Sequence, residues 1–99
     1  MVRIAFDRTR IAEFCRKWQV KELSLFGSVL RADFGPDSDV DVLVEFAPGG
    51  GITFENRVEI QDELAAIFGR EVDVVVKDFL RNSFRRHSIL STRELVYAS

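Results

Sequence analysis

The sequence has too few cysteine and histidine residues for several common kinds of site. It contains one cysteine, Cys15, and one histidine, His87. One cysteine cannot form an internal disulfide, and the pair cannot supply the four ligands of a structural zinc site. Cys/His metal chemistry is therefore excluded.

Long apolar runs and an excess of charge of one sign are also missing. No apolar stretch approaches the roughly 20 residues that span a bilayer, and residues 1–7 do not resemble a secretory signal. We therefore expect a cytoplasmic protein that does not enter a membrane. The 14 Lys and Arg residues against 16 Asp and Glu residues give a net charge of −2, so we expect no direct binding to nucleic acid.

What is present is enough apolar material for one domain. The chain has 99 residues, of which 46% are hydrophobic, and it shows no repeat and no shift in composition. We assign residues 1–99 to a single domain. One loose segment, Ala47-Pro48-Gly49-Gly50-Gly51, predicts a mobile loop.

Helical spacing of apolar residues predicts four helical segments. Asp7 is placed to cap a first helix whose buried stripe is Ile11, Phe14, Cys15 and Trp18. A short helix of one or two turns is expected over residues 29–33. Thr53 is placed to cap a helix that ends near Phe68, before Gly69, with its apolar side formed by Phe54, Val58, Gln61, Leu64, Ala65 and Phe68. Asp78 is expected to cap a last helix that includes Phe84, Ile89 and Leu90.

Alternating apolar residues predict strands at residues 22–26, 40–46 and 71–76, and a short edge strand at 94–97. Residues 35–38, Gly-Pro-Asp-Ser, form a turn that precedes the second strand. The order of helices and strands indicates an α/β (α+β) fold. We expect a small mixed β-sheet with helices packed mainly on one face.

Acidic residues interrupt two of these strands. Asp39 and Asp41 are two residues apart, so their side chains leave the same face of the sheet, roughly 7 Å apart at Cα. If the strand at 71–76 pairs beside them, Asp73 joins the same cluster. Clustered carboxylates repel one another and favour hard cations such as Mg²⁺ or Mn²⁺. Taken alone, each acid is equally consistent with a solvated residue of a turn or of an exposed strand face.

A glycine and a serine precede the acids at a fixed distance. Gly27 allows a phosphate to approach the backbone, and Ser28 offers a hydroxyl and an amide at the start of a helix. Ten residues later comes Asp39-Val40-Asp41, which gives the pattern G-S-x10-D-x-D. Because a two-metal site stabilises in-line displacement at phosphorus, the combination indicates phosphate chemistry.

This pattern, with the stretch LFGSVLRADFGPDSDVDVLVEF and the later VDVVV, resembles the polymerase-β-like nucleotidyltransferases. The length resembles their smallest branch, the minimal nucleotidyltransferase (MNT) domain proteins. The resemblance implies that Gly27 and Ser28 hold the β- and γ-phosphates of ATP. It also implies that Asp39 and Asp41 bind Mg²⁺, and that Asp73 completes a second metal site and acts on the attacking hydroxyl.

The branch often carries G-S-x-A-R-G, and here Leu30 and Ala32 stand where alanine and glycine are usual. Arg31 keeps the position of the arginine, where it either contacts phosphate or bridges to Asp33 or Asp41; the structural role is the one we favour. Another basic cluster contains Arg81, Arg85, Arg86 and Arg93. Contact with an acidic partner or with RNA is open for it, and solvent exposure without a partner is the default interpretation.

The resemblance further implies a partner. MNT proteins act beside small HEPN-type toxins, as antitoxins that transfer AMP from ATP to a toxin tyrosine, which is the leading hypothesis for this chain. An apolar patch built from Trp18, Phe79 or Phe84 is a candidate contact surface. Two alternatives remain open: a non-catalytic nucleotide-binding antitoxin that neutralises its partner by binding alone, and nucleotidyl transfer to a small molecule such as an aminoglycoside.

Overall fold

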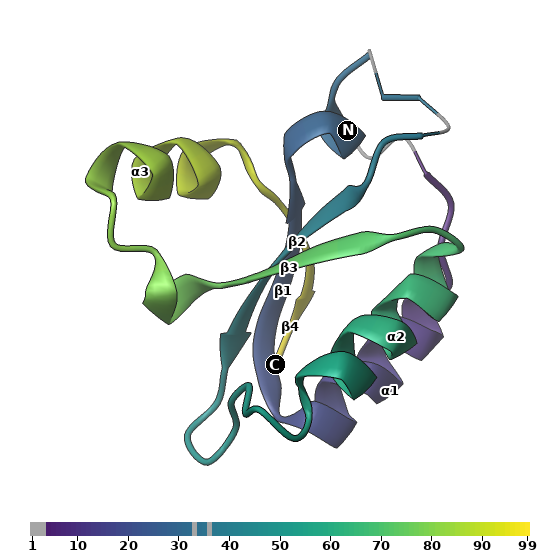
Figure 1. Ribbon diagram of the computed structural model, residues 1–99, viewed down its shortest axis with the longest axis vertical. Coiled ribbons are helices and arrows are strands. Elements are labelled where there is room, and N and C mark those ends of the chain that lie inside the picture. The colour runs from purple at the N-terminus through teal and green to yellow at the C-terminus, as the bar shows by residue number, and fades with distance from the viewer. Residues whose placement is uncertain (1–3, 33, 36) are drawn as a thin grey trace.

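The computed structural model describes residues 4–32, 34–35 and 37–99 (Figure 1). The helices and strands follow the expected order, with one additional short helical turn. In chain order they are α1 (Arg8–Trp18), β1 (Val20–Phe26), η1 (Gly27–Leu30), β2 (Val40–Phe46), α2 (Arg57–Phe68), β3 (Val72–Val76), η2 (Lys77–Phe79), α3 (Ser83–Thr92) and β4 (Glu94–Ala98).

The four strands form one mixed sheet in the order β3-β2-β1-β4. β1 is antiparallel to both β2 and β4, whereas β2 is parallel to β3. Figure 1 shows α1 and α2 on one side of the sheet and α3 on the other. The predicted fold class, a small mixed sheet with helices mainly on one face, is therefore confirmed.

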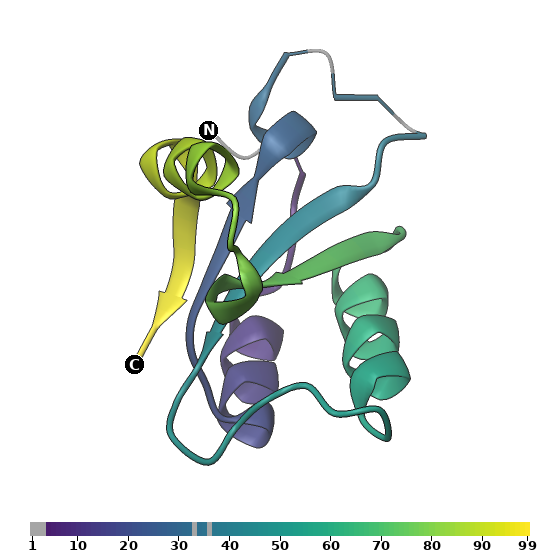
Figure 2. The ribbon, with the colours of Figure 1, turned by 60° about the vertical axis from the view of Figure 1, so that its left-hand side comes forward.

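The main core lies between the sheet and the helices α1 and α2. Val40, Val42 and Val44 alternate along β2 and are fully buried on this face. A second, smaller cluster on the opposite face joins β1 and β2 to α3 and the segment before it, through Phe26, Leu43, Leu80 and Ile89. This cluster holds α3 over part of the sheet and leaves the rest of that face open (Figure 2).

The first helix begins as predicted. The Asp7 side chain accepts hydrogen bonds from the backbone N–H groups of Thr9 and Arg10, at 2.8 and 3.3 Å. Such a cap satisfies N–H groups that have no partner within the helix. The expected stripe is also confirmed, since Ile11, Phe14 and Cys15 are buried and Trp18 is half-buried.

A helix capped by Thr53 would begin at residue 54, and α2 begins three residues later, at Arg57. The Thr53 hydroxyl nevertheless accepts from the Asn56 N–H, and the Asn56 side chain accepts from the Thr53 N–H, which is the reciprocal pattern of a capping box around the turn that leads into the helix. The buried side of α2 consequently consists of Ile60, Leu64 and Phe68. Phe54, Val58 and Gln61, which were expected on that side, are exposed. The predicted end at Gly69 is confirmed by its left-handed backbone, φ 73°.

Two other helix boundaries also differ from the predictions. Asp78 does not cap the last helix, because it lies in the separate turn η2; the cap is Asn82, whose side chain accepts from the Arg85 N–H at 3.0 Å. The short helix expected over residues 29–33 begins two residues earlier, at Gly27, and ends at Leu30. Asp33 lies outside the described residues.

The glycine loop after β2 packs against the end of α1. The Ala47 N–H donates to the Gln19 carbonyl at 2.8 Å, and a Cβ on Gly50 would lie 2.9 Å from that oxygen.

Across the part of the chain that the structure describes, every helix is too short or too polar to cross a membrane.

Candidate active site

The two acidic strands are neighbours, which is the condition under which Asp73 joins the cluster. β2 and β3 run parallel with Asp41 directly opposite Asp73, so both carboxylates leave the same, open face of the sheet. Asp39 comes directly before β2 and is exposed. The sheet register therefore brings together three acids that are up to 34 residues apart in the sequence.

The three carboxylates influence one another. Partial burial raises the pKa of Asp41 above its usual range, and the charges of Asp73 and Asp39 raise it further. Arg31 and Arg85 oppose this change, because their positive charges favour the ionised carboxylate. Asp41 is thus the centre of the acidic cluster, and the two cations that act on it come from the residue after η1 and from α3.

The backbone angle of Gly27 and the nearness of Asp41 both favour glycine at this position. Its φ of +76° is one that residues with a side chain rarely adopt, and a Cβ at this position would collide with Oδ2 of Asp41. The backbone of the Gly-Ser turn therefore lies directly against the central carboxylate. Phe26, just before Gly27, is the residue of β1 that pairs with Asp41.

A pocket of about 470 Å³ opens beside this turn, between η1 and α3. Its lining consists of Phe26, Gly27, Leu30, Arg31, Ser88, Ile89 and Thr92. The turn itself is closed by the Arg31 N–H, which donates to the Ser28 carbonyl at 2.9 Å. Gly27 and Arg31 therefore lie beside this pocket and near Asp41, and Ser28 follows Gly27 in the same turn.

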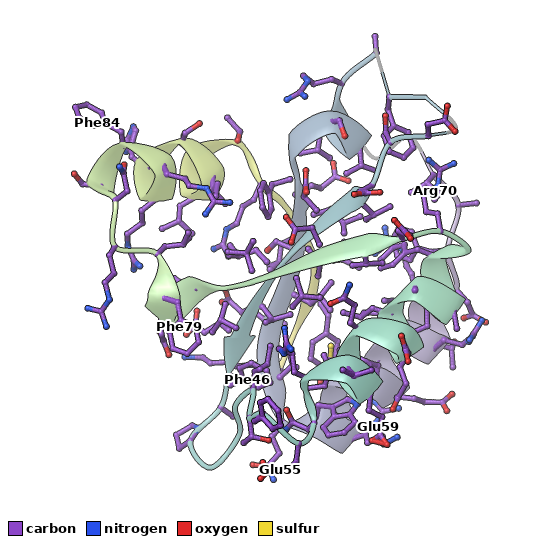
Figure 3. All side chains as sticks on the ribbon, viewed as in Figure 1. Phe46, Glu55, Glu59, Arg70, Phe79 and Phe84 are labelled. Atoms are coloured by element: carbon purple, nitrogen blue, oxygen red, sulfur yellow. The ribbon has the colours of Figure 1, made fainter. Side chains whose placement is uncertain are left out.

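Arg70 fixes the segment that leads into β2, which sequence reasoning missed. Its guanidinium donates to the carbonyls of Gly35 and Ser38 at 3.0 and 3.1 Å, and it lies over the Phe34 ring at 4.5 Å (Figure 3). These contacts hold the residue just before Asp39. The sequence carries no local sign of this contact, because Arg70 is more than 30 residues from its partners.

The arginines of the basic cluster near the end of the chain have different roles. Arg93 donates to Glu22 and to the buried Ser24 hydroxyl, each at 3.3 Å, and Arg86 donates to the Lys77 carbonyl at 3.2 Å. The interpretation of these two residues as solvated is therefore wrong. Arg85 acts electrostatically on Asp41, which makes it a site residue that the sequence alone did not reveal.

The three aromatic residues considered as alternatives for a contact patch do not have equivalent positions. Phe79 and Phe84 are 66% and 88% exposed and lie on η2 and α3 (Figure 3). Trp18 is half-buried and donates to Glu63 at 3.3 Å, in contact with α2. A patch on the α3 side can therefore include the two phenylalanines, whereas Trp18 contributes to the packing of α1 on α2.

The candidate site contains only oxygen donors of the kind that hard divalent cations prefer. Over residues 4–32, 34–35 and 37–99, no three His, Cys, Asp or Glu side chains are oriented around one point as a ligand set. The Asp39, Asp41 and Asp73 carboxylates are thus grouped by charge and by sheet register. Their mutual repulsion at Asp41 is the property that a bound cation would relieve.

Cys15 is not available as a nucleophile. It lies in the main core, and burial raises the pKa of its thiol to about 12. Because the thiolate is the reactive form, this cysteine is inert at neutral pH. The candidate groups for chemistry on the open face of the sheet are therefore the aspartates.

Most of the chain has counterparts among known proteins. The family model described as "Nucleotidyltransferase domain" matches residues 8–96. The protein adenylyltransferase MntA of Thermococcus cleftensis is 33% identical over 85 residues, covering 86% of this chain and 81% of the relative. A Methanocaldococcus jannaschii protein classed among the protein adenylyltransferases is 33% identical over 81 residues, covering 82% and 79%. The chain belongs to the nucleotidyltransferase domain family.

Solved structures show the same fold. A toxin–antitoxin crystal structure with AMP-PNP matches with a TM-score of 0.73 at 19% identity, covering 94% of this chain and 74% of that one. An MNT antitoxin complex with a tri-AMPylated HEPN toxin of Shewanella oneidensis matches with a TM-score of 0.62 at 21% identity, covering 93% and 70%. At these identities the likeness establishes the fold alone.

Proposed function

We propose that this protein is a Mg²⁺-dependent adenylyltransferase that transfers AMP from ATP to a tyrosine of a HEPN-type toxin, as its antitoxin. The observation that carries the proposal is the placement of Asp41, which lies opposite Asp73 and directly against Gly27. A triphosphate site and a carboxylate cluster in direct contact are what nucleotidyl transfer requires. The relatives named as protein adenylyltransferases support the choice of AMP and of a protein acceptor.

In the proposed reaction, the tyrosine oxygen forms a bond to the α-phosphorus of ATP. The bond from that phosphorus to the bridging oxygen of the β-phosphate breaks, and pyrophosphate leaves with the electron pair. Gly27 and Ser28 hold the β- and γ-phosphates, and Asp73 orients the attacking hydroxyl and accepts its proton. Asp39, Asp41 and Asp73 would hold Mg²⁺, which supplies charge neutralisation at the phosphates and a lower pKa for the attacking hydroxyl.

The cations around the site have distinct proposed roles. Arg31 and Arg85 both act electrostatically on Asp41, and each favours its ionised form. Arg31 belongs to the turn that would hold the phosphates and to the pocket beside it, so it is placed to stabilise the nucleotide. The same pocket, about 470 Å³, offers room for the part of the nucleotide beyond its phosphates.

The test is to incubate the protein and its co-purifying HEPN-type partner with ATP and Mg²⁺ and to measure the intact mass of the partner. We expect a gain of one or more AMP units, located on tyrosine by peptide sequencing and abolished by EDTA. Asp41→Asn should reduce the rate by ~10²-fold or more, since it removes a charge on which the transition state depends. Asp37→Asn, which changes an exposed acid four residues away, is the matched control and should retain activity.

A stable complex without any mass gain would contradict catalysis and favour neutralisation by binding alone. In that case Asp39→Asn with Asp41→Asn would still neutralise the toxin in cells. Loss of neutralisation in the double variant, with the complex intact, would support the catalytic mechanism.

A further inference from the structure

A pocket of about 410 Å³ follows the outer edge of β3. One wall is formed by the start of α2 and the segment before it, and the other by η2 and the start of α3. We call this pocket the β3 groove; it is lined by Ile52, Arg57, Ile60, Gln61, Asp73, Val74, Val75, Val76, Phe79, Leu80 and Arg85. Figure 1 views the sheet from this side, with β3 in front and the α2 and α3 helices to either side.

The floor of the β3 groove is the backbone of an edge strand. Within the described chain, β3 pairs with β2 on one side only. The Glu71 carbonyl accepts from the Val40 N–H of the β2 side at 3.0 Å, and successive peptide groups of a strand point to opposite sides. The N–H and C=O groups of Val74 and Val76 therefore point outward, into the groove. Outward-facing peptide groups on an edge strand are a template for a further strand.

The groove is continuous with the candidate active site. Asp73 lines the groove and is also the residue directly opposite Asp41. A strand added beside β3 would lie about 4.8 Å from it, with every second side chain on the open face. One such side chain would be a direct neighbour of Asp73, on the same face as Gly27 and Asp41.

The walls of the groove define the chemistry of the segment that it fits. Arg57 and Arg85 contribute positive charge from opposite walls, and Asp73 is the acid among the lining residues. Phe79 and Leu80 give an apolar surface beside the open face, where Phe79 is 66% exposed. An aromatic side chain fits beside this surface, and acidic neighbours fit the two arginines.

We propose that the β3 groove binds an extended segment of the acceptor protein as a fifth strand. In this arrangement the accepting tyrosine lies beside Asp73, and acidic residues of the segment face Arg57 and Arg85. The inference rests on the proposed function, because it specifies how the acceptor of that reaction is bound. The added strand positions the hydroxyl, and the chemistry remains that of the aspartates.

The direct test is hydrogen exchange of individual amides, with and without the HEPN-type partner. We expect the N–H groups of Val74 and Val76 to exchange rapidly in the free protein and to become at least ~10-fold slower in the complex. The N–H groups of Asp73 and Val75 point toward β2 and serve as the internal control. AMP transfer to the same partner is measured in parallel by intact mass.

The two measurements separate the two proposals. AMP transfer without protection of Val74 and Val76 would overturn the strand-addition model and leave the proposed function intact. Protection without AMP transfer would overturn the proposed function and leave the groove as a docking site. Absence of both would overturn both.

Side-chain variants give an independent readout. Arg57→Glu and Phe79→Ser should each raise the KM for the protein acceptor by ~10-fold or more and leave the KM for ATP unchanged. The matched controls are Arg81→Glu and Phe54→Ser, which alter exposed residues that do not line the groove. If the controls raised the KM for the acceptor as much as the groove variants do, the acceptor would bind outside the β3 groove and the proposal would be wrong.

Discussion

Gly27 and Asp41 are in such close contact that a single added carbon on Gly27 would collide with the Asp41 carboxylate. The Gly-Ser turn and the acidic strand are thus one unit. We expect Gly27→Ala to displace Asp41 and to abolish AMP transfer. It should also lower the free energy of unfolding by about 2–4 kcal/mol, from a strained backbone together with overpacking.

Gly69→Ala is the control for that variant. Gly69 has almost the same φ, +73°, but nothing lies within 4 Å of its position for a Cβ. It should show only the backbone cost, about 1–2 kcal/mol, with activity retained. Equal effects of the two substitutions in urea unfolding would mean that the contact with Asp41 is unimportant.

Asp41→Asn should stabilise the protein while it inactivates it. A carboxyl whose pKa is raised on folding holds its proton more tightly in the folded state, so stability is lost as pH rises through that pKa. Removing the charge should raise the free energy of unfolding at pH 7 by about 0.2–1 kcal/mol, the cost of like charges on adjacent strands. Thermal unfolding in EDTA should show this gain shrinking as the pH falls below the raised pKa. A loss of stability that is the same at every pH would contradict the repulsion.

Arg70 should act on the site through the segment before Asp39. Arg70→Met removes two hydrogen bonds from a charged donor and the contact with Phe34, so we expect a loss of about 1.5–3 kcal/mol. AMP transfer should fall with KM for ATP and kcat both affected, since Asp39 is less well held. Arg16→Met, on the exposed surface of α1, should change stability by less than about 0.5 kcal/mol. Full activity in a folded Arg70→Met protein would exclude a positioning role.

The cap of α3 can be identified by a pair of alanine variants. Asn82→Ala removes the acceptor for the Arg85 N–H and should cost about 1 kcal/mol, with faster amide exchange at the start of α3. Asp78→Ala, at the position that the sequence suggested, should leave that exchange unchanged. Faster exchange in Asp78→Ala than in Asn82→Ala would mean that Asp78 caps the helix, as the sequence suggested.

We expect Arg93 to stabilise the fold, whereas Arg81, from the same basic cluster, should contribute little. Arg93→Met breaks the bonds from the start of β4 to Glu22 and to the buried Ser24 on β1, which we expect to cost about 1–2 kcal/mol. Arg81→Met alters an exposed arginine and should be nearly neutral in the same chemical unfolding experiment. If Arg93→Met left the free energy of unfolding unchanged, the hydrogen bonds of Arg93 to Glu22 and Ser24 would add nothing measurable to stability.

Local patterns predicted most of the fold. The stripe of α1 and the alternating valines of β2 follow the periods that a helix and a strand impose on their side chains. The Asp7 cap depends on one residue beside the helix. All three can therefore be predicted from neighbouring residues. The errors lie at helix starts. At α2, Thr53 and Asn56 cap a turn that precedes the regular helix, and the spacing of apolar residues does not show where that turn ends.

The sequence by itself determined which residues can perform phosphate chemistry: a glycine, a serine and three aspartates at fixed spacing along predicted strands. Only the tertiary structure decided what surrounds them. The parallel register of β2 and β3 sets Asp41 opposite Asp73, and long-range packing brings Arg70 to the segment before Asp39 and Arg85 near Asp41. These relationships join residues more than 30 positions apart, and they depend on how whole elements pack, a property that no local pattern encodes.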